Sequence, residues 1–411
     1  MRRRQNRLAA GRTALTLLTA LGALAGTALV GAGPAGAVPD GTRLAPGVVY
    51  EHFDIEGARG TAHAHLLRVD LTDPRVTLDL LHPGKVAARE PVSRLADTRG
   101  AVAGVNGDFF NITEVQHPGV EATGASVGPA VASGRTLKAA VPDGQRFGPA
   151  LPPGTSTEDV VGMGVDRRVR LDGMTLHGSI RTVTGQLRLG GLNQYALPVN
   201  SVGAFTSVWG SVSRLRATCG TDTERAAPCS GDTHEVTIRG GRVVSTADTP
   251  GSGAIEPGTT VLVGREAGAQ ELRKFVPGQP VTVRHRLVAD DSRIPYRFAV
   301  GGYPVLAGGQ PLPGLDDTTS AVRSAVGIEE GGRQVLLLSL DGGPEYRGLT
   351  IAEVAAALRG LGAADAFSLD GGGSSTLVAR DPGASAVTVR NHPSGGAERP
   401  VPNGIGVFVT P

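Results

Sequence analysis

The sequence has few aromatic residues, almost no sulfur and almost no net charge, and these shortages exclude several classes of function. Lysine and arginine number 40 against 38 acidic residues, which leaves a formal net charge of +2. A chain without a basic surplus offers no electrostatic basis for binding nucleic acid. The nine histidines are scattered, and none stands at the spacing of a His-Glu-x-x-His metal motif. We therefore expect no nucleic-acid partner and no required cofactor.

Cysteine occurs only twice, as Cys219 and Cys229. In an exported protein, two cysteines this close in sequence predict a local disulfide that closes a loop, worth about 3 kcal/mol in the chain-entropy model. A zinc site would need more ligands nearby than His234 alone. The pair therefore indicates a disulfide rather than a metal centre.

The chain has only one long apolar run, Ala14–Val30. Four arginines precede it within the first seven residues, and Ala35-Gly36-Ala37 follows it. This pattern predicts a secretory signal peptide over residues 1–37 that is cleaved after Ala37. A single membrane anchor is the alternative, but the small residues at its end favour cleavage. We expect a secreted, extracellular protein without stable membrane insertion.

Short β-branched and apolar runs separated by glycine and proline dominate the rest of the chain. They predict an α+β fold made of mixed, largely antiparallel β-sheets with few helices and a C-terminal strand–helix–strand unit. Residues 38–100 are expected to form a β-rich segment that packs on a main domain, residues 101–411, which carries a β-rich middle insertion. The expected early elements are an antiparallel meander of Val48–Ile55, His63–Val69 and Val76–Leu81 and a helix over Pro91–Thr98.

The middle of the chain, from about residue 119 to residue 299, shows no sustained helical periodicity. Asp172-Gly173 is interpreted as a turn between two strands, Arg168–Leu171 and Thr175–Thr182. The proline- and glycine-rich segment Pro142–Thr157 is typical of a loop.

The last third of the chain has the clearest pattern. Arg323–Ile328 and Arg333–Leu340 predict an antiparallel hairpin. A capping box of Thr350 and Glu353 then starts a helix, and Ala366–Leu369 forms the next strand. The strands on either side of this helix should be parallel, in one sheet, and joined by a right-handed crossover.

Both of these parallel strands end in an aspartate followed by glycine, Asp341 and Asp370. Because parallel strands have their carboxyl ends at one edge of a sheet, the two carboxylates should face one crevice. Two close carboxylates can repel each other and divide into an acid and a base. The alternative is a strand that ends in an ordinary polar turn. After Asp370 come the residues that we expect to hold an anion: Gly371, Gly372, Gly373, Ser374 and Ser375.

Three further residues are expected near the same edge. Arg323 should pair near Leu338, which brings a guanidinium suited to a phosphate close to Asp341, although a structural salt bridge to Asp341 is an equal alternative. Asn106 and Asp108 end a third apolar strand, where they offer an amide for sugar hydroxyls and a third carboxylate. An ordinary Asn-Gly turn is the favoured alternative there.

Several of these motifs together resemble the phosphodiester glycosidase family. The residues that carry the resemblance are Val105–Phe110, Gly301–Leu306, Arg323–Gly327, Leu340-Asp341-Gly342, Gly348-Leu349-Thr350, Leu369–Thr376 and Arg399–Asn403. The chain departs from the family at two motifs. The family often has Asp-Gly-Arg where this chain has Asp341-Gly342-Gly343, and it tends to have Asn-Leu-Asp where this chain has Ser368-Leu369-Asp370. One arginine contact there is missing or comes from Arg347.

The resemblance implies hydrolysis of a sugar from a phosphodiester at its anomeric carbon, and therefore a carbohydrate phosphodiester substrate. We assign the base or nucleophile to Asp370, with Asp341 or Asp108 in the second role. Asn106, Arg323, Ser374 and Ser375 would hold sugar or phosphate. A bacterial cell-wall polymer or exopolysaccharide is the expected natural substrate.

Three alternatives stay open at this point. One is a non-catalytic module that binds wall polymer, and another is a hydrolase with Ser374 as nucleophile, although no nucleophile-elbow motif surrounds that serine. The third is a divalent cation bridging Asp108, Asp341 and Asp370, because carboxylate clusters attract hard cations.

Overall fold

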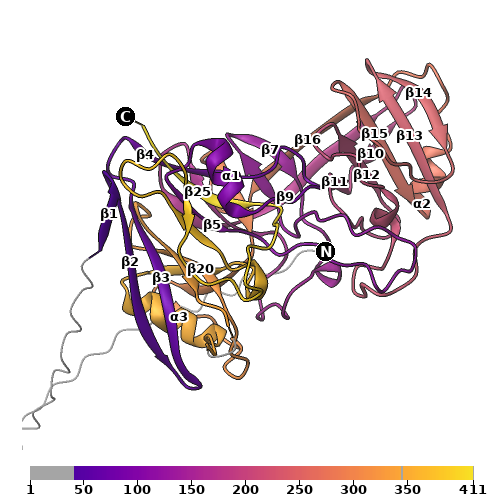
Figure 1. Cartoon of the computed structure of the whole chain (residues 1–411). Coiled ribbons are helices and arrows are strands. Elements are labelled where there is room, and N and C mark those ends of the chain that lie inside the picture. Colours follow the sequence, from indigo (N-terminus) through magenta and orange to yellow (C-terminus); the bar gives the residue numbers. More distant parts are fainter. Residues whose placement is uncertain (1–40, 344–345, 411) are drawn as a thin grey trace, which may run out of the picture. The chain divides into compact units, whose positions relative to one another are not determined.

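Antiparallel β-sheets dominate the computed structural model, which describes residues 41–343 and 346–410 (Figure 1). The α+β class with few helices is confirmed, because these residues contain only three α-helices among many strands. The expected signal peptide, residues 1–37, lies outside the described residues. Within them, none of the helices is long and apolar enough to cross a membrane.

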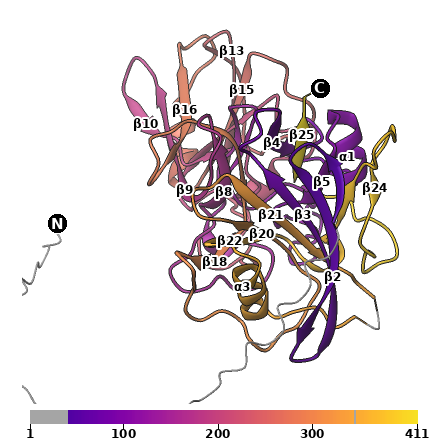
Figure 2. The ribbon, with the colours of Figure 1, turned by 90° about the vertical axis from the view of Figure 1, so that its left-hand side faces the viewer.

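The largest sheet has eight strands and combines the N-terminal part of the described chain with its last third (Figure 2). Strand β3 pairs antiparallel with β21, from Asp70 opposite Gln334 to Ala64 opposite Leu340. The N-terminal strands are therefore part of this sheet. In spatial order its strands are β1 (Thr42–Ala45), β2 (Val48–Gly57), β3 (Gly60–Asp70), β21 (Gln334–Leu340), β20 (Ser324–Ile328), β22 (Asp365–Ser368), β18 (Tyr303–Ala307) and β19 (Gln310–Pro311).

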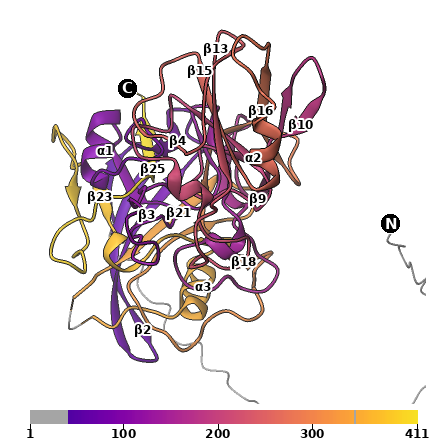
Figure 3. The ribbon, with the colours of Figure 1, turned by 90° about the vertical axis from the view of Figure 1, so that its right-hand side faces the viewer.

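The C-terminal strand–helix–strand unit is present. Strands β21 and β22 are parallel because each pairs antiparallel with β20, which lies between them. Helix α3 (Ile351–Gly360) connects them and packs against β18 and β22 (Figure 3). Thr350 and Glu353 form the expected capping box at its start. In the β20–β21 hairpin Leu338 pairs with Ala325, two residues from the expected partner Arg323, because the connection is longer than a four-residue turn.

A five-stranded sheet contains the chain's C-terminal strand. The expected opening meander is wrong in its third member, because β4 leaves β3 and pairs with β25 instead. Helix α1 (Val92–Arg99) follows β4, one residue later than expected, and leads into β5. In spatial order the sheet is β24 (Thr388–Val389), β23 (Leu377–Ala379), β5 (Ala103–Asn106), β25 (Gly404–Val409) and β4 (Val76–Leu81).

A seven-stranded sheet holds the first half of the middle region. The expected turn at Asp172-Gly173 is wrong, because β9 runs straight through these two residues. Strand β16 (Thr282–Ala289) pairs with β9 beside the main order. That order is β10 (Gln186–Arg188), β9 (Val169–Arg181), β8 (Asp159–Gly164), β17 (Tyr296–Gly301), β6 (Ala130–Ala132) and β7 (Arg135–Lys138).

The remaining sheet has five strands, four of which lie side by side with α2 in Figure 1. Helix α2 (Ala267–Leu272) was not expected, because six residues are too few to show a helical period. The sheet's order is β11 (Gly191–Leu192), β12 (Val202–Thr206), β15 (Thr259–Arg265), β13 (Thr233–Arg239) and β14 (Arg242–Ala247). The short 3₁₀ helices of the chain are η1 (Asp143–Gln145), η2 (Leu215–Thr218) and η3 (Gly372–Ser374).

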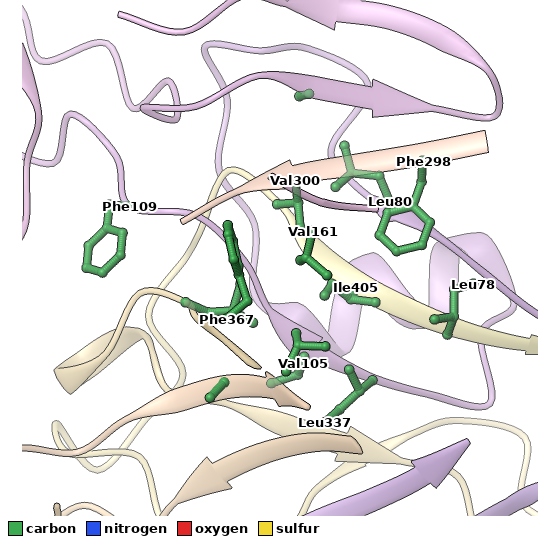
Figure 4. Packing of buried hydrophobic residues seen from close by; sticks show 14 of the residues in the cluster. Leu78, Leu80, Val105, Phe109, Val161, Phe298, Val300, Leu337, Phe367 and Ile405 are labelled. Carbon is green, nitrogen blue, oxygen red and sulfur yellow. The ribbon is translucent and has the colours of Figure 1, made fainter. Parts of the chain in front are cut away.

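The main hydrophobic core takes buried side chains from all four sheets. Figure 4 shows Leu337 of β21, Val105 of β5 and Val161 of β8 among its buried side chains. Because strands from distant parts of the sequence fill one core, their ends are held in fixed positions relative to one another. The candidate site is built on the ends of β5, β20 and β22.

Candidate active site

The loop after β22 is attached to the end of β5 by hydrogen bonds. The Asn106 side-chain amide donates to the Asp370 carbonyl at 2.7 Å, and the Asp370 N–H donates to the Gly107 carbonyl at 2.9 Å. Asn106 Oδ1 also accepts from Ser324 Oγ at 2.7 Å and from the Thr376 N–H at 3.1 Å. Asn106 is fully buried, so it joins strand ends instead of presenting its amide to a sugar as expected.

The three glycines after Asp370 each have a different reason to lack a side chain. A Cβ on Gly371 would lie 2.6 Å from the Val322 carbonyl oxygen, and Gly372 has a φ of 58°. A Cβ on Gly373 would lie 2.6 Å from the guanidinium carbon of Arg399. Glycine is therefore needed at 371 and 372 for the path of the loop, whereas at 373 it leaves room for the end of the Arg399 side chain.

Two of the glycine amides that were expected to bind an anion donate their hydrogen bonds to groups of the protein instead. The Gly371 N–H donates to Asp370 Oδ1 at 3.0 Å, and the Gly372 N–H donates to the Val322 carbonyl at 2.8 Å. These two amides fix the loop and the Asp370 carboxylate. Arginine side chains, rather than these amides, supply positive charge next to Asp370.

Asp370 has the ionisation behaviour of a candidate acid or base. Burial raises the pKa of its carboxyl to about 6, against the lowering effects of a hydrogen bond from Ser374 and the charge of Arg399. The negative charge of Asp108 contributes to the increase. Asp108 and Asp370 therefore interact electrostatically at this site, as two carboxylates with separate environments.

Asp108 is buried at the start of the loop that follows β5. Its Oδ2 accepts from the Gly128 N–H at 2.6 Å, whereas its Oδ1 has no hydrogen-bond partner among the described residues. Burial raises the pKa of Asp108, and the charge of Lys138 opposes that increase. Lys138 is itself buried and donates to the carbonyls of Val127, Gly128 and Ala139, while burial lowers its pKa.

Arg146 lies beside both carboxylates, and no sequence pattern predicts it as a site residue. Its guanidinium carbon stands 4.2 Å from the ring centre of Phe109 and 5.2 Å from that of Tyr303. Burial lowers its pKa, whereas the charges of Asp108 and Asp370 act to raise it. Nη1 donates to the Pro149 carbonyl, and Nη2 is buried without an acceptor among the residues that the structure describes.

Arg399 is the second cation at the site, and it too was not proposed as a site residue, although it begins one of the motifs. Its Nη1 donates to Ser374 Oγ at 3.3 Å. Its charge lowers the pKa of Asp370. Ser375 is buried, and its Oγ has no partner among the described residues. Of the two serines, Ser374 is the one that interacts with Asp370.

Asp341 lies in a different polar cluster from Asp370. Its Oδ1 accepts from His65 Nε2 at 2.9 Å and from the His392 N–H at 2.6 Å, and its Oδ2 lies 3.0 Å from His392 Nδ1. Burial acts to raise the pKa of Asp341, but these hydrogen bonds and the charges of the two histidines lower it. Strand β20 separates the two strands that carry Asp341 and Asp370, so the structure does not bring these carboxylates together as expected.

The side chain of Arg323 does not reach either aspartate. Nε donates to the Leu349 carbonyl at 3.1 Å and Nη2 to the Thr319 carbonyl at 2.8 Å. Burial lowers the pKa of this guanidinium. Neither the expected salt bridge to Asp341 nor a direct pairing with Asp370 is found within the described part of the chain. Arg323 instead anchors the loop next to Gly371.

The three aspartates do not form the metal-ligand set considered from the sequence. Within residues 41–343 and 346–410, the one group of three possible ligands closer than 4.8 Å is His117 with Cys219 and Cys229. Those cysteines form the expected disulfide, so their sulfurs are bonded to each other. His234, considered from the sequence, pairs with Asp248 instead.

The fold and the site together define a β-rich protein in which a buried and a partly buried carboxylate interact beside two arginines. Residues 232–408 match the model of the phosphodiester glycosidase family. The resemblance to this family is thus confirmed for this part of the chain. A comparison with curated proteins gave no match.

Two solved structures share the fold. A hypothetical protein from Synechocystis is 18% identical with a TM-score of 0.67, and the match covers 90% of this chain but only 64% of that one. A Burkholderia pseudomallei protein described as exported is 23% identical with a TM-score of 0.63, covering 86% of this chain and 75% of that one. A third match, to the catalytic domain of zebrafish N-acetylglucosamine-1-phosphodiester α-N-acetylglucosaminidase auto-inhibited by its pro-peptide, is 15% identical with a TM-score of 0.44 and covers 89% and 84% of the two chains.

Proposed function

We propose that the protein hydrolyses glycosyl-1-phosphodiesters. Water adds to the anomeric carbon, the bond from that carbon to the phosphate oxygen breaks, and the products are a free sugar and a phosphomonoester. The observation that carries this proposal is the pair of interacting carboxylates, buried Asp108 and partly buried Asp370, next to Arg146 and Arg399 in a chain whose residues 232–408 match the phosphodiester glycosidase family.

The arrangement of charges suits this reaction. A phosphate is a good leaving group, so stabilisation of its negative charge replaces much of the proton donation that other glycosidases need. Arg146 and Arg399 would supply that charge, and the unpaired Nη2 of Arg146 is available to a phosphate oxygen. Asp370 would act as base or nucleophile at the oxocarbenium-like centre.

Asp108 is proposed to assist Asp370. Its charge raises the pKa of Asp370, and its Oδ1 is buried without a partner within the described residues. Asp341, which the sequence also offered for this role, is engaged with His65 and His392. We therefore keep Asp341 as a residue that orders the His392 loop, whose Ser394 hydroxyl donates to the Gly372 carbonyl at 3.2 Å.

The first prediction concerns Asp370→Asn. This substitution should lower kcat on UDP-N-acetylglucosamine or another sugar-1-phosphodiester by at least about a thousandfold, because the base or nucleophile is lost. The matched control is Asp317→Asn, which changes an exposed aspartate that makes no hydrogen bond or ion pair among the described residues and should retain full activity. Release of free sugar is measured by NMR, which also reports its anomeric form. Wild-type turnover by the Asp370→Asn protein would remove Asp370 from the mechanism.

The two alternatives from the sequence predict other results. A wall-binding module would bind glycosyl phosphodiesters without releasing product. A serine hydrolase would form an adduct between Ser374 and a fluorophosphonate probe. Among the described residues no histidine hydrogen-bonds Ser374, which instead interacts with Asp370 and Arg399, so nothing at the site favours that chemistry.

We also propose that the protein works outside the cell. The N-terminal sequence pattern and the Cys219–Cys229 disulfide support export to an oxidising compartment. Detection of a mature form beginning at Val38 in culture medium would test this. A cell-wall polymer or exopolysaccharide with glycosyl-1-phosphate linkages is the natural substrate class that we would test first.

A further inference from the structure

The segment that brings Arg146 to the site has little regular structure of its own. It follows the three-residue helix η1 (Asp143–Gln145) in a loop rich in glycine and proline. Arg146 is nevertheless buried, with its guanidinium beside two stacked aromatic rings and next to two carboxylates. Some other part of the molecule must hold this segment in place.

The neighbouring loop between Cys219 and Cys229 makes the necessary contacts. The Gly144 N–H donates to the Asp222 carbonyl at 2.9 Å. Gln145 Nε2 donates to the carbonyls of Thr221 at 2.5 Å and Glu224 at 3.2 Å. These three acceptors are backbone atoms, so the contacts depend on the conformation of the loop and not on its side chains.

One loop side chain contacts Arg146 directly. Arg225 Nη1 donates to the Arg146 carbonyl at 2.7 Å. Its guanidinium carbon also lies 4.1 Å from the ring centre of Phe147. Arg225 therefore holds the Arg146 carbonyl and packs on the side chain of the next residue, Phe147.

A disulfide closes this loop at its base. Inside it, the Gly220 N–H donates to the Ala227 carbonyl and the Thr221 N–H donates to the Glu224 carbonyl, but no strand or helix is present from residue 220 to residue 228. The bond between Cys219 and Cys229 closes the loop across a separation of ten residues. At its base, Arg216 donates to the Cys219 carbonyl at 3.2 Å and to Gln145 Oε1 at 3.0 Å.

We propose that the disulfide-closed loop, residues 219–229, positions Arg146 at the site and thereby sets the affinity for the phosphate group of the substrate. The loop acts through the main chain of residues 144–147, and Arg146 is the side chain that contacts phosphate. This inference rests on the proposed function for the identity of the substrate, but the binding of phosphate alone tests it independently.

The test compares loop variants in the full chain by two measurements. The variants are the Cys219→Ser/Cys229→Ser double substitution and Arg225→Met, and the matched control is Ala226→Ser, an exposed position in the same loop. Calorimetric titration with inorganic phosphate gives Kd, and turnover of UDP-N-acetylglucosamine gives kcat and KM. Both loop variants should raise Kd and KM by about tenfold or more, the loss expected for one displaced charge-assisted contact. Ala226→Ser should change neither.

The same substitutions in an Arg146→Ala background decide how the loop acts. If the loop works through Arg146, adding the loop substitution there should change the phosphate Kd by less than about twofold, because the two effects are not additive. A correctly folded Arg225→Met protein with the wild-type Kd, equal losses in both backgrounds, or a wild-type protein that binds no phosphate would each overturn the inference. Phosphate binding without turnover of any sugar phosphodiester would reject the proposed function and leave this inference standing.

Discussion

The two arginines beside Asp370 differ in how far the sequence reveals them. Arg399 begins a motif of the family, Arg399–Asn403, and the requirement for glycine at position 373 shows that its side chain packs on the loop. Arg146 stands in a segment whose only pattern is that of a loop. Its role depends on the rings of Phe109, in the loop after β5, and Tyr303, in β18, so no local spacing reveals it.

Gly373→Ala tests the close approach of Arg399. The added methyl group would lie 2.6 Å from the guanidinium carbon, so the end of the arginine must move away from Asp370 and Ser374. Loss of one charge-assisted contact should reduce kcat/KM by roughly tenfold to a hundredfold. Stability should change little, because a flexible side chain can move. Kinetic assay and urea unfolding measure the two effects.

The control for this variant is Gly395→Ala, because a methyl group there has open space around it. That protein should keep its activity and its stability. Equal activity of the Gly373→Ala and wild-type proteins would show that Arg399 does not act at the site.

The raised pKa of Asp370 also has a consequence for stability. The native carboxyl has a pKa of about 6 against an ordinary value of 3.8, so the native state binds more protons than the unfolded state between these values. This group therefore lowers the free energy of unfolding as pH rises from about 4 to about 6. Above that range the decrease has reached its full size. Asp370→Asn should be more stable than the wild type by on the order of 1–3 kcal/mol at pH 8, and equally stable near pH 3. Chemical denaturation at several pH values measures this difference.

The activity should depend on pH in the matching direction. If Asp370 must be ionised, kcat/KM falls as pH decreases through about 6. An Asp370→Asn protein whose advantage in stability is the same at pH 3 and pH 8 would contradict the raised pKa.

At the scale of elements, the sequence was most informative where local signals and sheet pairing agree. The β20–β21 hairpin, the capping box of α3 and the parallel relation of β21 and β22 follow from patterns within about fifty residues. The position of β20 between these two strands does not follow from such patterns, because the order of strands in a sheet depends on which neighbours pack best. The expected meeting of Asp341 with Asp370 was wrong for this reason.

Asp172 illustrates the opposite case, in which a local sequence pattern predicts the wrong structure. Asp172-Gly173 reads as a turn, but the strand continues and the buried carboxylate accepts from the N–H groups of Asp290, Asp291 and Ser292 and from Tyr296 Oη. The aspartate thus anchors a loop that lies more than a hundred residues away in the sequence. A motif of two residues carries no information about such a partner.

Asp172→Ala should therefore destabilise the protein. Removal of the carboxylate leaves the N–H groups of Asp291 and Ser292 and the Tyr296 hydroxyl without this acceptor, while the Asp290 N–H keeps the Gly173 carbonyl. The loss should cost on the order of 3 kcal/mol in the free energy of unfolding. The control Asp291→Ala changes an exposed side chain and should stay within about 0.5 kcal/mol of the wild type. Urea unfolding curves give both values, and equal stability of the two variants would refute this role.

At the scale of the whole molecule, the site extends beyond the part of the chain that matches the family. The matched residues 232–408 contain Asp370 and Arg399, but Asp108 and Arg146 precede them. The sheets extend in the same way, since β21 pairs with β3, and β25 pairs with β4 and β5. Residues before position 107 thus complete both sheets that carry the site.

Residues 232–408 alone should not fold into a stable domain. Without β3, strand β21 would expose Leu336, Leu337 and Leu338 along an unpaired edge, and β25 would lose both of its neighbours. We expect this fragment to show no cooperative thermal transition and rapid proteolysis, whereas residues 39–411 should unfold cooperatively at the same protein concentration. A protease-resistant fragment 232–408 with a sharp transition would show that these residues fold independently of the N-terminal strands. Failure of the fragment would show that the fold and the site need both ends of the chain, because Asn106 of β5, which hydrogen-bonds the loop after β22, precedes that loop by more than two hundred residues.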